Sequence, residues 1–139
     1  MARAIDLPPE AQRRIANDQV VWLTTITDSG APAPNPVWFV PDGESLVVYA
    51  APESHKVHNI GRRNHVSLHF NSDPNGTDVV VINGDAELEN DQRPSALPAY
   101  VKKYERSVAE DLQQTFDDLD RQFHTRIRIR PTRVRLTEA

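Results

Sequence analysis

Cysteine is absent from the 139 residues of this chain. Its absence excludes disulfides, thiolate zinc sites and cysteine nucleophiles at once. The chain also lacks an apolar run long enough to cross a bilayer, and its opening stretch, MARAIDLPPEAQRRIA, contains nothing like the apolar core of a signal peptide. We therefore expect a cytoplasmic protein with no membrane partner.

A surplus of positive charge is also missing. The chain has 16 Lys and Arg against 20 Asp and Glu, and its formal net charge is -4. Without a general basic field we expect no nucleic-acid partner. The arginine-rich segment 125–136 alternates its arginines with Ile127 and Ile129, and we interpret it as a solvated strand face beside the acidic segment 110–120. The serine-hydrolase motif G-x-S-x-G does not occur either.

The chain does contain a series of short β-branched segments that turn residues separate. We predict six strands, within residues 20–27, 31–40, 45–50, 64–70, 78–90 and 125–136. Prolines restrict the second and the last of these strands to an edge or a bulge, and Gly84 predicts a bulge or a close approach of two backbones. Such a series is typical of a β-barrel, and the length fits a single domain, 1–139.

Two stretches have helical signals. Residues 7–18 contain two prolines at the start and place Ala11 and Ile15 on one side, which predicts a short helix covering one end of the barrel. The region from 91 to 123 is charged and has helical periodicity. Its apolar residues at that spacing are Leu112, Phe116, Leu119 and Phe123.

The stretch ESHKVHNIGRRNHVSLHF, residues 53–70, concentrates basic and imidazole side chains in an acidic chain. A helix here would place Lys56, Asn59 and Arg63 on one face, with Ser54 at the N-cap. An anion at that helix start would meet free backbone N–H groups, a hydroxyl and an ammonium group. In the alternative interpretation, Arg62 and Arg63 complement the negative end of the helix dipole and are simply solvated.

Five histidines raise the question of a metal or haem site. His55 and His58 would share a helix face without an obvious carboxylate partner, and His65 and His69 are too far apart on a strand to share one ion. We therefore expect no metal site. A haem would need an axial histidine, for which His69 and His124 are candidates, although both are also explained as surface or core-edge histidines.

Four stretches, taken in order, carry a family resemblance: VVWLTTITDSGAPAPNPVWFVPDGESLVVYA, ESHKVHNIGRRNHVSLHF, VVVINGDAEL and TRIRIRPTRVRL. They resemble the pyridoxamine 5'-phosphate oxidase-like split β-barrel superfamily, whose members bind FMN or the deazaflavin coenzyme F-420. The chain is most similar to the small actinobacterial F-420-dependent oxidoreductases, through its proline-rich second strand ending in Trp-Phe and its Ser-x-Lys-x-x-Asn-Ile helix entry. The resemblance implies a mainly β, α+β fold: a six-stranded antiparallel split β-barrel of the FMN-binding type, with flanking helices.

The resemblance also implies which residues hold the cofactor. Ser54, His55 and Lys56 lie where the family has its Ser-Arg-Lys phosphate clamp, with Asn59 just behind. The flavin ring would lie along the second strand, on the segment Pro34, Asn35, Pro36, Val37 and Trp38.

Departures from the true oxidases favour F-420 over FMN as the cofactor. Asn35 and Val40 stand about where those enzymes carry a basic pair for the FMN phosphate, and His55 replaces the clamp arginine. Arg62 and Arg63 would meet the carboxylates of the longer F-420 tail.

The resemblance therefore implies an oxidoreductase that transfers hydride between reduced F-420 and a small organic acceptor, such as a quinone, an enone or a tetrapyrrole. It assigns no catalytic side chain, because the cofactor supplies the hydride chemistry. The alternative in the same fold is a non-enzymatic protein that binds or stores FMN, F-420 or haem. We expect a homodimer with the cofactor at the subunit interface, because a split barrel leaves an apolar sheet face and proline-containing edges uncovered.

Overall fold

Seven strands and four α-helices make up the computed structural model, which describes residues 5–136. The elements in chain order are α1 (Pro9–Asn17), β1 (Val20–Ile26), β2 (Pro32–Trp38), β3 (Val40–Asp42), β4 (Ser45–Ala50), α2 (His55–Arg62), β5 (His65–His69), β6 (Val80–Asn90), α3 (Pro98–Arg106), α4 (Phe116–Gln122) and β7 (Thr125–Leu136). A 3₁₀ turn, Pro94–Ala96, precedes α3, and a π-helical turn, Ser107–Asp111, follows it. No helix within residues 5–136 has the length and apolar character needed to cross a bilayer.

The strands form one antiparallel sheet in the order β2-β1-β5-β6-β7-β4-β3, curled into a split β-barrel. The predicted fold class is confirmed, with seven strands rather than six, because the predicted strand 31–40 divides at Phe39. The part before Phe39 pairs with β1 and the part after it pairs with β4, so the chain passes from one end of the strand order to the other. Since β2 has a single neighbour, the edge position that its prolines predict is confirmed.

A bulge interrupts the pairing of β6 with β7 at Gly84, as the sequence predicts. Asn83 pairs with Arg133 and Gly84 pairs with Pro131, so Thr132 is an extra residue on β7. A Cβ atom on Gly84 would lie 2.8 Å from the Arg130 carbonyl oxygen, so glycine is required for this close approach of two backbones. Pairing of β7 with β4 ends at Ile129, so Pro131, which is buried, needs no N–H group for a bond to β4.

The region from 91 to 123 is not one continuous helix. Gln113 has a positive φ of 53°, which ends the π-helical turn and separates it from α4. A capping box between Thr115 and Asp118 then starts α4. Leu112 consequently lies outside the predicted apolar stripe and is 45% exposed, whereas Leu119 is buried. The inclusion of Leu112 in that helical stripe was wrong, because the positive φ beside it changes the direction of the chain.

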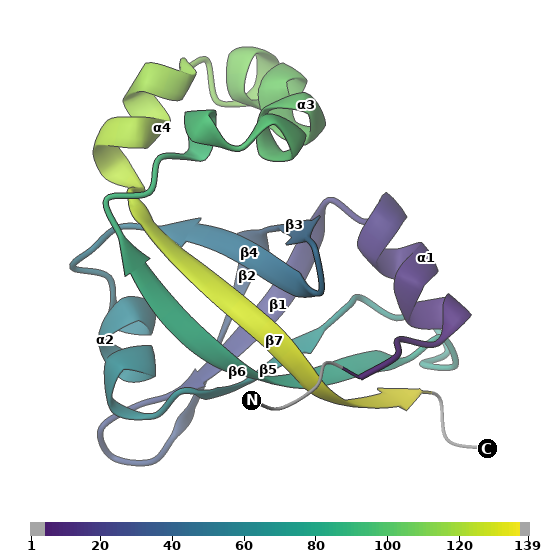
Figure 1. Cartoon of the computed structure of the whole chain (residues 1–139). Coiled ribbons are helices and arrows are strands. Elements are labelled where there is room, and N and C mark those ends of the chain that lie inside the picture. The colour runs from purple at the N-terminus through teal and green to yellow at the C-terminus, as the bar shows by residue number, and fades with distance from the viewer. Residues whose placement is uncertain (1–4, 137–139) are drawn as a thin grey trace.

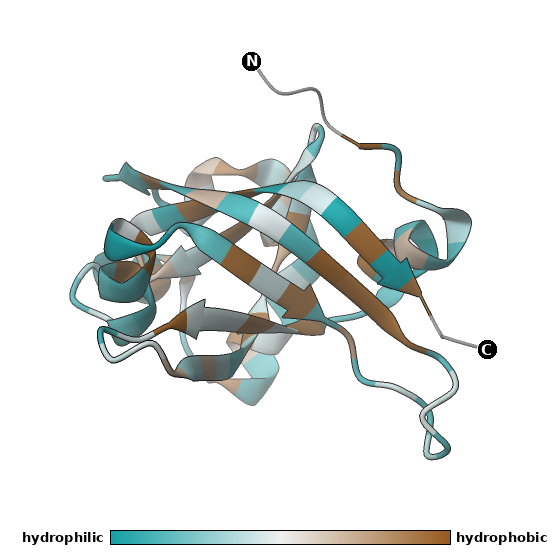
Figure 2. Cartoon of the chain, turned by 90° about the horizontal axis from the view of Figure 1, so that it is seen from below, coloured by the Kyte–Doolittle hydropathy of each residue, from teal (hydrophilic) through white to brown (hydrophobic). Residues whose placement is uncertain are grey.

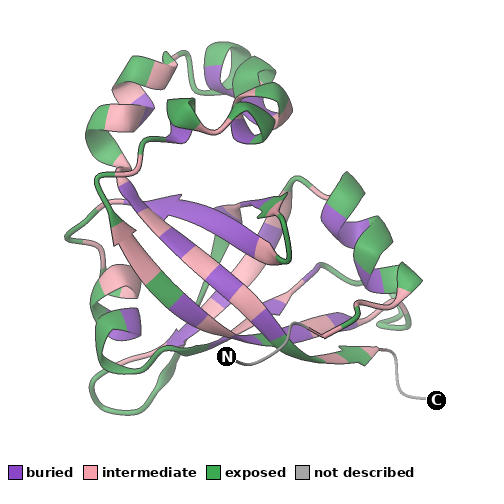
Figure 3. Ribbon diagram, viewed as in Figure 1, coloured by how far each residue is buried: buried purple, intermediate pink, exposed green. Residues whose placement is uncertain are grey.

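Two apolar clusters hold these elements together (Figures 2 and 3). The larger cluster fills the inside of the curled sheet, and α1 contributes Ala11 and Ile15 to it, as expected for a helix over a barrel end. The smaller cluster lies between β3, β4 and the helices α3 and α4, and includes Tyr49, Tyr100 and Tyr104. Because both faces of β4 are covered, nearly all of its residues are buried, and the strand reads as a continuous apolar run.

Candidate functional site

The start of α2 presents an unpaired buried hydroxyl group. Ser54 is the N-cap residue, with an extended backbone at φ -68° and ψ 154°, yet its side chain makes no capping hydrogen bond. Its Oγ is buried and has no hydrogen-bond partner among the described residues. A buried polar group without a protein partner is costly, so this hydroxyl is a candidate ligand-binding group at the helix N-terminus, where free N–H groups also point.

Lys56 adds a positive charge in the first turn of α2. Its side chain is half-buried, and that burial lowers the pKa of its ammonium group. No other charged group contributes to the shift, so within residues 5–136 no carboxylate neutralises this ammonium. His55, the first residue of α2, is exposed beside it. The hydroxyl, the ammonium and the helix N-terminus together suit an anion such as phosphate.

Asn59 connects α2 to the sheet. It is 5% exposed, and its Nδ2 donates a hydrogen bond of 3.0 Å to Oγ1 of Thr25 on β1. Thr25 is itself buried, so this bond attaches α2 to the sheet. Lys56, Asn59 and Arg63 therefore do not form one open face, because the middle residue of the series points into the protein.

Arg62 and Arg63 lie at the opposite end of α2 and contact the turn between β1 and β2. Arg62 Nε lies 3.2 Å from Asp28 Oδ1, and Arg63 Nη1 donates a 2.6 Å hydrogen bond to the Thr27 carbonyl oxygen. His58 Nε2 lies 3.0 Å from the same Asp28. A hydrogen bond with His58, assisted by the two arginine charges, lowers the pKa of Asp28. Three basic side chains thus surround one carboxylate, which leaves this corner positive when all are charged.

The second-strand residues divide between the surface and the core. Pro34, Asn35 and Pro36 are exposed along the free edge of β2, whereas Val37 is 8% exposed. Trp38 is half-buried and stacks on Tyr104 of α3, with ring centroids 4.4 Å apart and planes within 1°. The exposed stretch available to a ligand on this strand is therefore Pro34 to Pro36.

Tyr104 fixes the junction between β2 and β3, a role that the sequence did not reveal. Its hydroxyl accepts a 2.8 Å hydrogen bond from the Phe39 N–H and can donate to the carbonyl oxygen of Gln19 at 2.7 Å. These bonds satisfy backbone groups at the point where the chain changes from one end of the sheet to the other. A buried tyrosine at helical spacing has no local feature that distinguishes this role from ordinary packing.

The arginines of β7 pair with acidic residues of neighbouring strands. Arg126 Nε lies 2.6 Å from Glu89 of β6, and Arg128 Nη1 lies 3.0 Å from Asp42 of β3. The expected partnership with the acidic segment 110–120 was wrong, because Glu89 is directly opposite Arg126 in the sheet. Among the described residues, no cluster of three or more His, Asp or Glu has the arrangement of a metal site.

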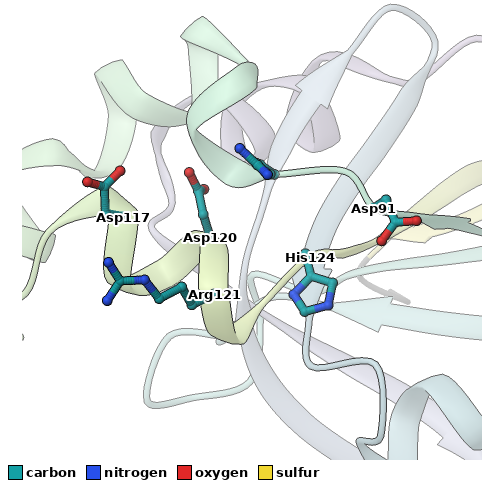
Figure 4. A pocket seen from close by; sticks show the side chains of 6 residues that line it. Asp91, Asp117, Asp120, Arg121 and His124 are labelled. Carbon is teal, nitrogen blue, oxygen red and sulfur yellow. The ribbon is translucent and has the colours of Figure 1, made fainter.

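A separate hollow of about 640 Å³ opens beside α4 and is shown in Figure 4. Its lining residues are Asp91, Arg93, Asp117, Asp120, Arg121 and His124. Three carboxylates and two guanidinium groups give it no surplus of positive charge, so it does not suit a phosphate. None of the residues expected to hold F-420 or FMN lines it, but His124, a candidate axial ligand for haem, does.

Comparison of the sequence with models of known protein families gives a match over nearly the whole chain. The model of the pyridoxamine 5'-phosphate oxidase family matches residues 7–138. The chain belongs to this family. No curated protein matches the chain.

Solved structures of similar fold include proteins of more than one kind. An F420 reductase is 24% identical, with a TM-score of 0.73, over 93% of this chain and 98% of that one. A putative pyridoxamine 5'-phosphate oxidase from Listeria innocua is also 24% identical, with a TM-score of 0.66, over 91% and 94% of the two chains. HutZ, the heme storage protein from Vibrio cholerae, is 17% identical, with a TM-score of 0.65, over 96% of both. At these identities the likeness concerns the fold.

Proposed function

We propose that the start of α2 binds the phosphate of a flavin-type cofactor and that the protein is an oxidoreductase using coenzyme F-420. The observation that carries this proposal is the buried, unpaired Ser54 hydroxyl beside the unneutralised ammonium of Lys56. A phosphate oxygen would accept hydrogen bonds from the hydroxyl, the ammonium and the first N–H groups of α2. Family membership makes a cofactor with such a phosphate the natural ligand.

The reaction we propose is hydride transfer between reduced F-420 and a small organic acceptor such as a quinone, an enone or a tetrapyrrole. The cofactor supplies the hydride chemistry when it is bound. Ser54 and Lys56 would anchor its phosphate, and the exposed edge Pro34, Asn35 and Pro36 would position its ring. The contribution of this chain is thus binding, orientation and exclusion of water, and no side chain is required to act as an acid or base.

Charge favours F-420 over FMN in this proposal. Asn35 is neutral and Val40 is buried, so β2 and β3 offer no basic pair for an FMN phosphate. The exposed ion pair of Arg62 with Asp28 is weak, because solvent screens it, so carboxylates of an F-420 tail could compete for Arg62 and Arg63. The similar fold of an F420 reductase supports the same cofactor.

Titration of the purified protein with F-420, FMN and haem, followed by absorbance, tests the cofactor. We expect F-420 to bind most tightly, and we expect added salt to weaken F-420 binding more than FMN binding because the tail contacts are exposed charge pairs. Equal or tighter FMN binding would reverse this order. Tight haem binding would instead favour the storage role, which the similar fold of HutZ supports.

An activity assay separates the enzyme from a non-enzymatic binder. The loaded protein is mixed with quinone, enone or tetrapyrrole acceptors and reduced F-420, and the reoxidation of the coenzyme is followed. Turnover of at least one acceptor above the protein-free rate is expected for the oxidoreductase. Tight F-420 binding without turnover of any acceptor would identify a storage or carrier protein.

We also propose that the protein is a homodimer with the cofactor at the subunit interface. The exposed prolines of β2 leave one side of the cofactor site open in a single chain. Light scattering at micromolar concentration is expected to give twice the mass of one chain. A monomer under those conditions would contradict the proposal.

A further inference from the structure

A hollow of about 400 Å³ opens over β1, β5 and β6, away from the start of α2. Its lining residues from β1 and β5 are Thr24, Ile26, His65, Val66 and Ser67. Thr24 and Ser67 alternate with buried core residues along their strands, so their hydroxyl groups lie on the face of the sheet that is turned away from the larger apolar cluster. Of all the residues that line this hollow, His65 alone can carry a charge.

The bulge between β6 and β7 forms the rest of the hollow. Asn83, Gly84 and Thr132 line it from this side. Thr132 is the residue of β7 without a partner on β6, and its hydroxyl donates a 3.2 Å hydrogen bond to the Asn83 carbonyl oxygen. Bulges often lie beside active sites, because they change the direction in which side chains point.

A carboxylate orients the imidazole ring of His65. Nδ1 of His65 lies 2.6 Å from Oδ1 of Asp85, its direct partner on β6, and the other oxygen of Asp85 accepts a 3.3 Å hydrogen bond from Arg130. An ionised carboxylate can only accept, so Nδ1 donates and the position of the ring is fixed. Nε2 has no protein partner within residues 5–136, and the side chain is 85% exposed. This nitrogen is therefore available to a molecule in the hollow.

The hollow lies next to the proposed position of the cofactor ring. Pro34 of β2 pairs with Thr24, and Thr24 pairs with Ser67. Directly paired residues of antiparallel strands share one face, and neighbouring strands are about 4.8 Å apart. A ring that lies on Pro34 would thus be one strand away from Thr24 and would border the hollow.

We propose that this hollow binds the carbonyl compound that accepts the hydride, and that His65 donates a proton to its oxygen. The inference rests on the proposed function and names the substrate class for it. The volume is near the lower end for ligand pockets, so it suits an enone or a quinone of one or two rings rather than a tetrapyrrole. Asp85 acts through His65 and is a positioning residue.

The proposed step is balanced in electrons and protons. The acceptor gains a hydride, which carries two electrons, and the electron pair of its broken π bond moves to the carbonyl oxygen. Nε2 of doubly protonated His65 gives its proton to that oxygen. The reduced coenzyme supplies the hydride and releases one further proton to water, from which His65 is protonated again. Water can also protonate the oxygen directly, so His65 accelerates the step without being indispensable.

Binding of 4-nitrophenol to the protein without F-420 tests the acceptor site. The phenolate oxygen resembles the oxygen that becomes negative in the proposed step. NMR signals of the His65 ring should move during the titration, and they are assigned by their absence from His65→Gln. That variant should bind about tenfold more weakly, the effect of losing one hydrogen bond to a charged group. Since no coenzyme is present, this result is independent of the proposed function.

His69→Gln is the matched control. His69 lies on the same strand and the same face, but it stacks on Trp22 and does not line the hollow. Its replacement should leave the affinity for 4-nitrophenol unchanged. Asp85→Asn should weaken the binding several-fold, because the His65 ring is no longer held by a carboxylate. Equal affinities of the unchanged protein and His65→Gln, or no binding to either, would overturn the inference.

Two hydride acceptors separate proton donation from simple binding. 2-Cyclohexenone needs a hydride and a proton, whereas the methylene blue cation becomes neutral on taking a hydride alone. His65→Gln should lower the turnover of cyclohexenone about hundredfold and that of methylene blue less than about twofold, with the affinity for F-420 unchanged. An equal fall with both acceptors would contradict proton donation by His65. If the protein binds 4-nitrophenol through His65 but does not bind F-420, the acceptor site is supported and the proposed coenzyme is wrong.

Discussion

Replacing Lys56 with alanine is expected to weaken cofactor binding about ten- to hundredfold, because a charge-assisted hydrogen bond to phosphate contributes about 1.5–3 kcal/mol. The free energy of unfolding should change by less than about 0.5 kcal/mol, since no partner within the described chain is lost. Absorbance titration with F-420 measures the affinity, and urea unfolding measures the stability. If Lys56 is simply solvated at the surface, its replacement should change neither the affinity for F-420 nor the free energy of unfolding.

Two further variants locate the anion along α2. Ser54→Ala should weaken binding by about tenfold without loss of stability, although removal of an ordinary N-cap hydroxyl costs about 1 kcal/mol. Arg63→Ala should weaken binding less, because Arg63 lies at the far end of the helix and binds the Thr27 carbonyl. If replacing Arg63 lowers the affinity more than replacing Lys56 does, the anion lies at the C-terminal end of α2. If none of the Lys56, Ser54 and Arg63 variants changes the affinity for F-420, the basic side chains of α2 are simply solvated and the proposed site is wrong.

Gly84→Ala is expected to lower the free energy of unfolding by about 3 kcal/mol, the upper range for overpacking a core. The new Cβ would lie 2.8 Å from the Arg130 carbonyl oxygen and 2.8 Å from Cγ2 of Ile129. Ile129 is fully buried, so neither neighbour can move away without disturbing the pairing of β6 with β7. Urea unfolding followed by circular dichroism measures the loss.

Gly61→Ala is the matched control for this change. A Cβ atom on Gly61 would meet only Leu88 Cδ1, at 3.9 Å, and the residue lies within α2. Alanine should therefore raise the stability by about 0.5–1 kcal/mol, as it does in other helices. If Gly84→Ala changes stability by less than about 0.5 kcal/mol, the bulge can widen and the close approach does not demand glycine.

The positions of the strands could be predicted because each strand has a local pattern. Val66 and Leu68 alternate with polar neighbours on β5, and the prolines of β2 indicate an edge before any partner is known. The division at Phe39 could not be predicted, because it results from the curl of the sheet. Phe39 is a fully buried residue in a stretch that otherwise reads as one strand.

The candidate site was predictable only in part, for a similar reason. Ser54 and Lys56 lie within one helix turn, so their closeness in space could be predicted from their spacing in the sequence. Asp28 belongs to a turn between β1 and β2, and only the folded sheet brings it to His58. The burial of Asn59 likewise depends on Thr25, which lies 34 positions earlier in the chain. Contacts of this kind have no signature in a single sequence.

The prolines of β2 have a further consequence for self-association. Residues 32, 34 and 36 are all proline, and alternate residues of a strand direct their backbone groups to the same side. Since β1 pairs with the whole of β2, the missing N–H groups are those of the free edge. A further strand at the free edge of β2 could donate to the carbonyl oxygens there, but the prolines would offer no N–H group in return. Aggregation by strand addition at β2 is therefore disfavoured, and any partner chain must bind through side chains at this edge.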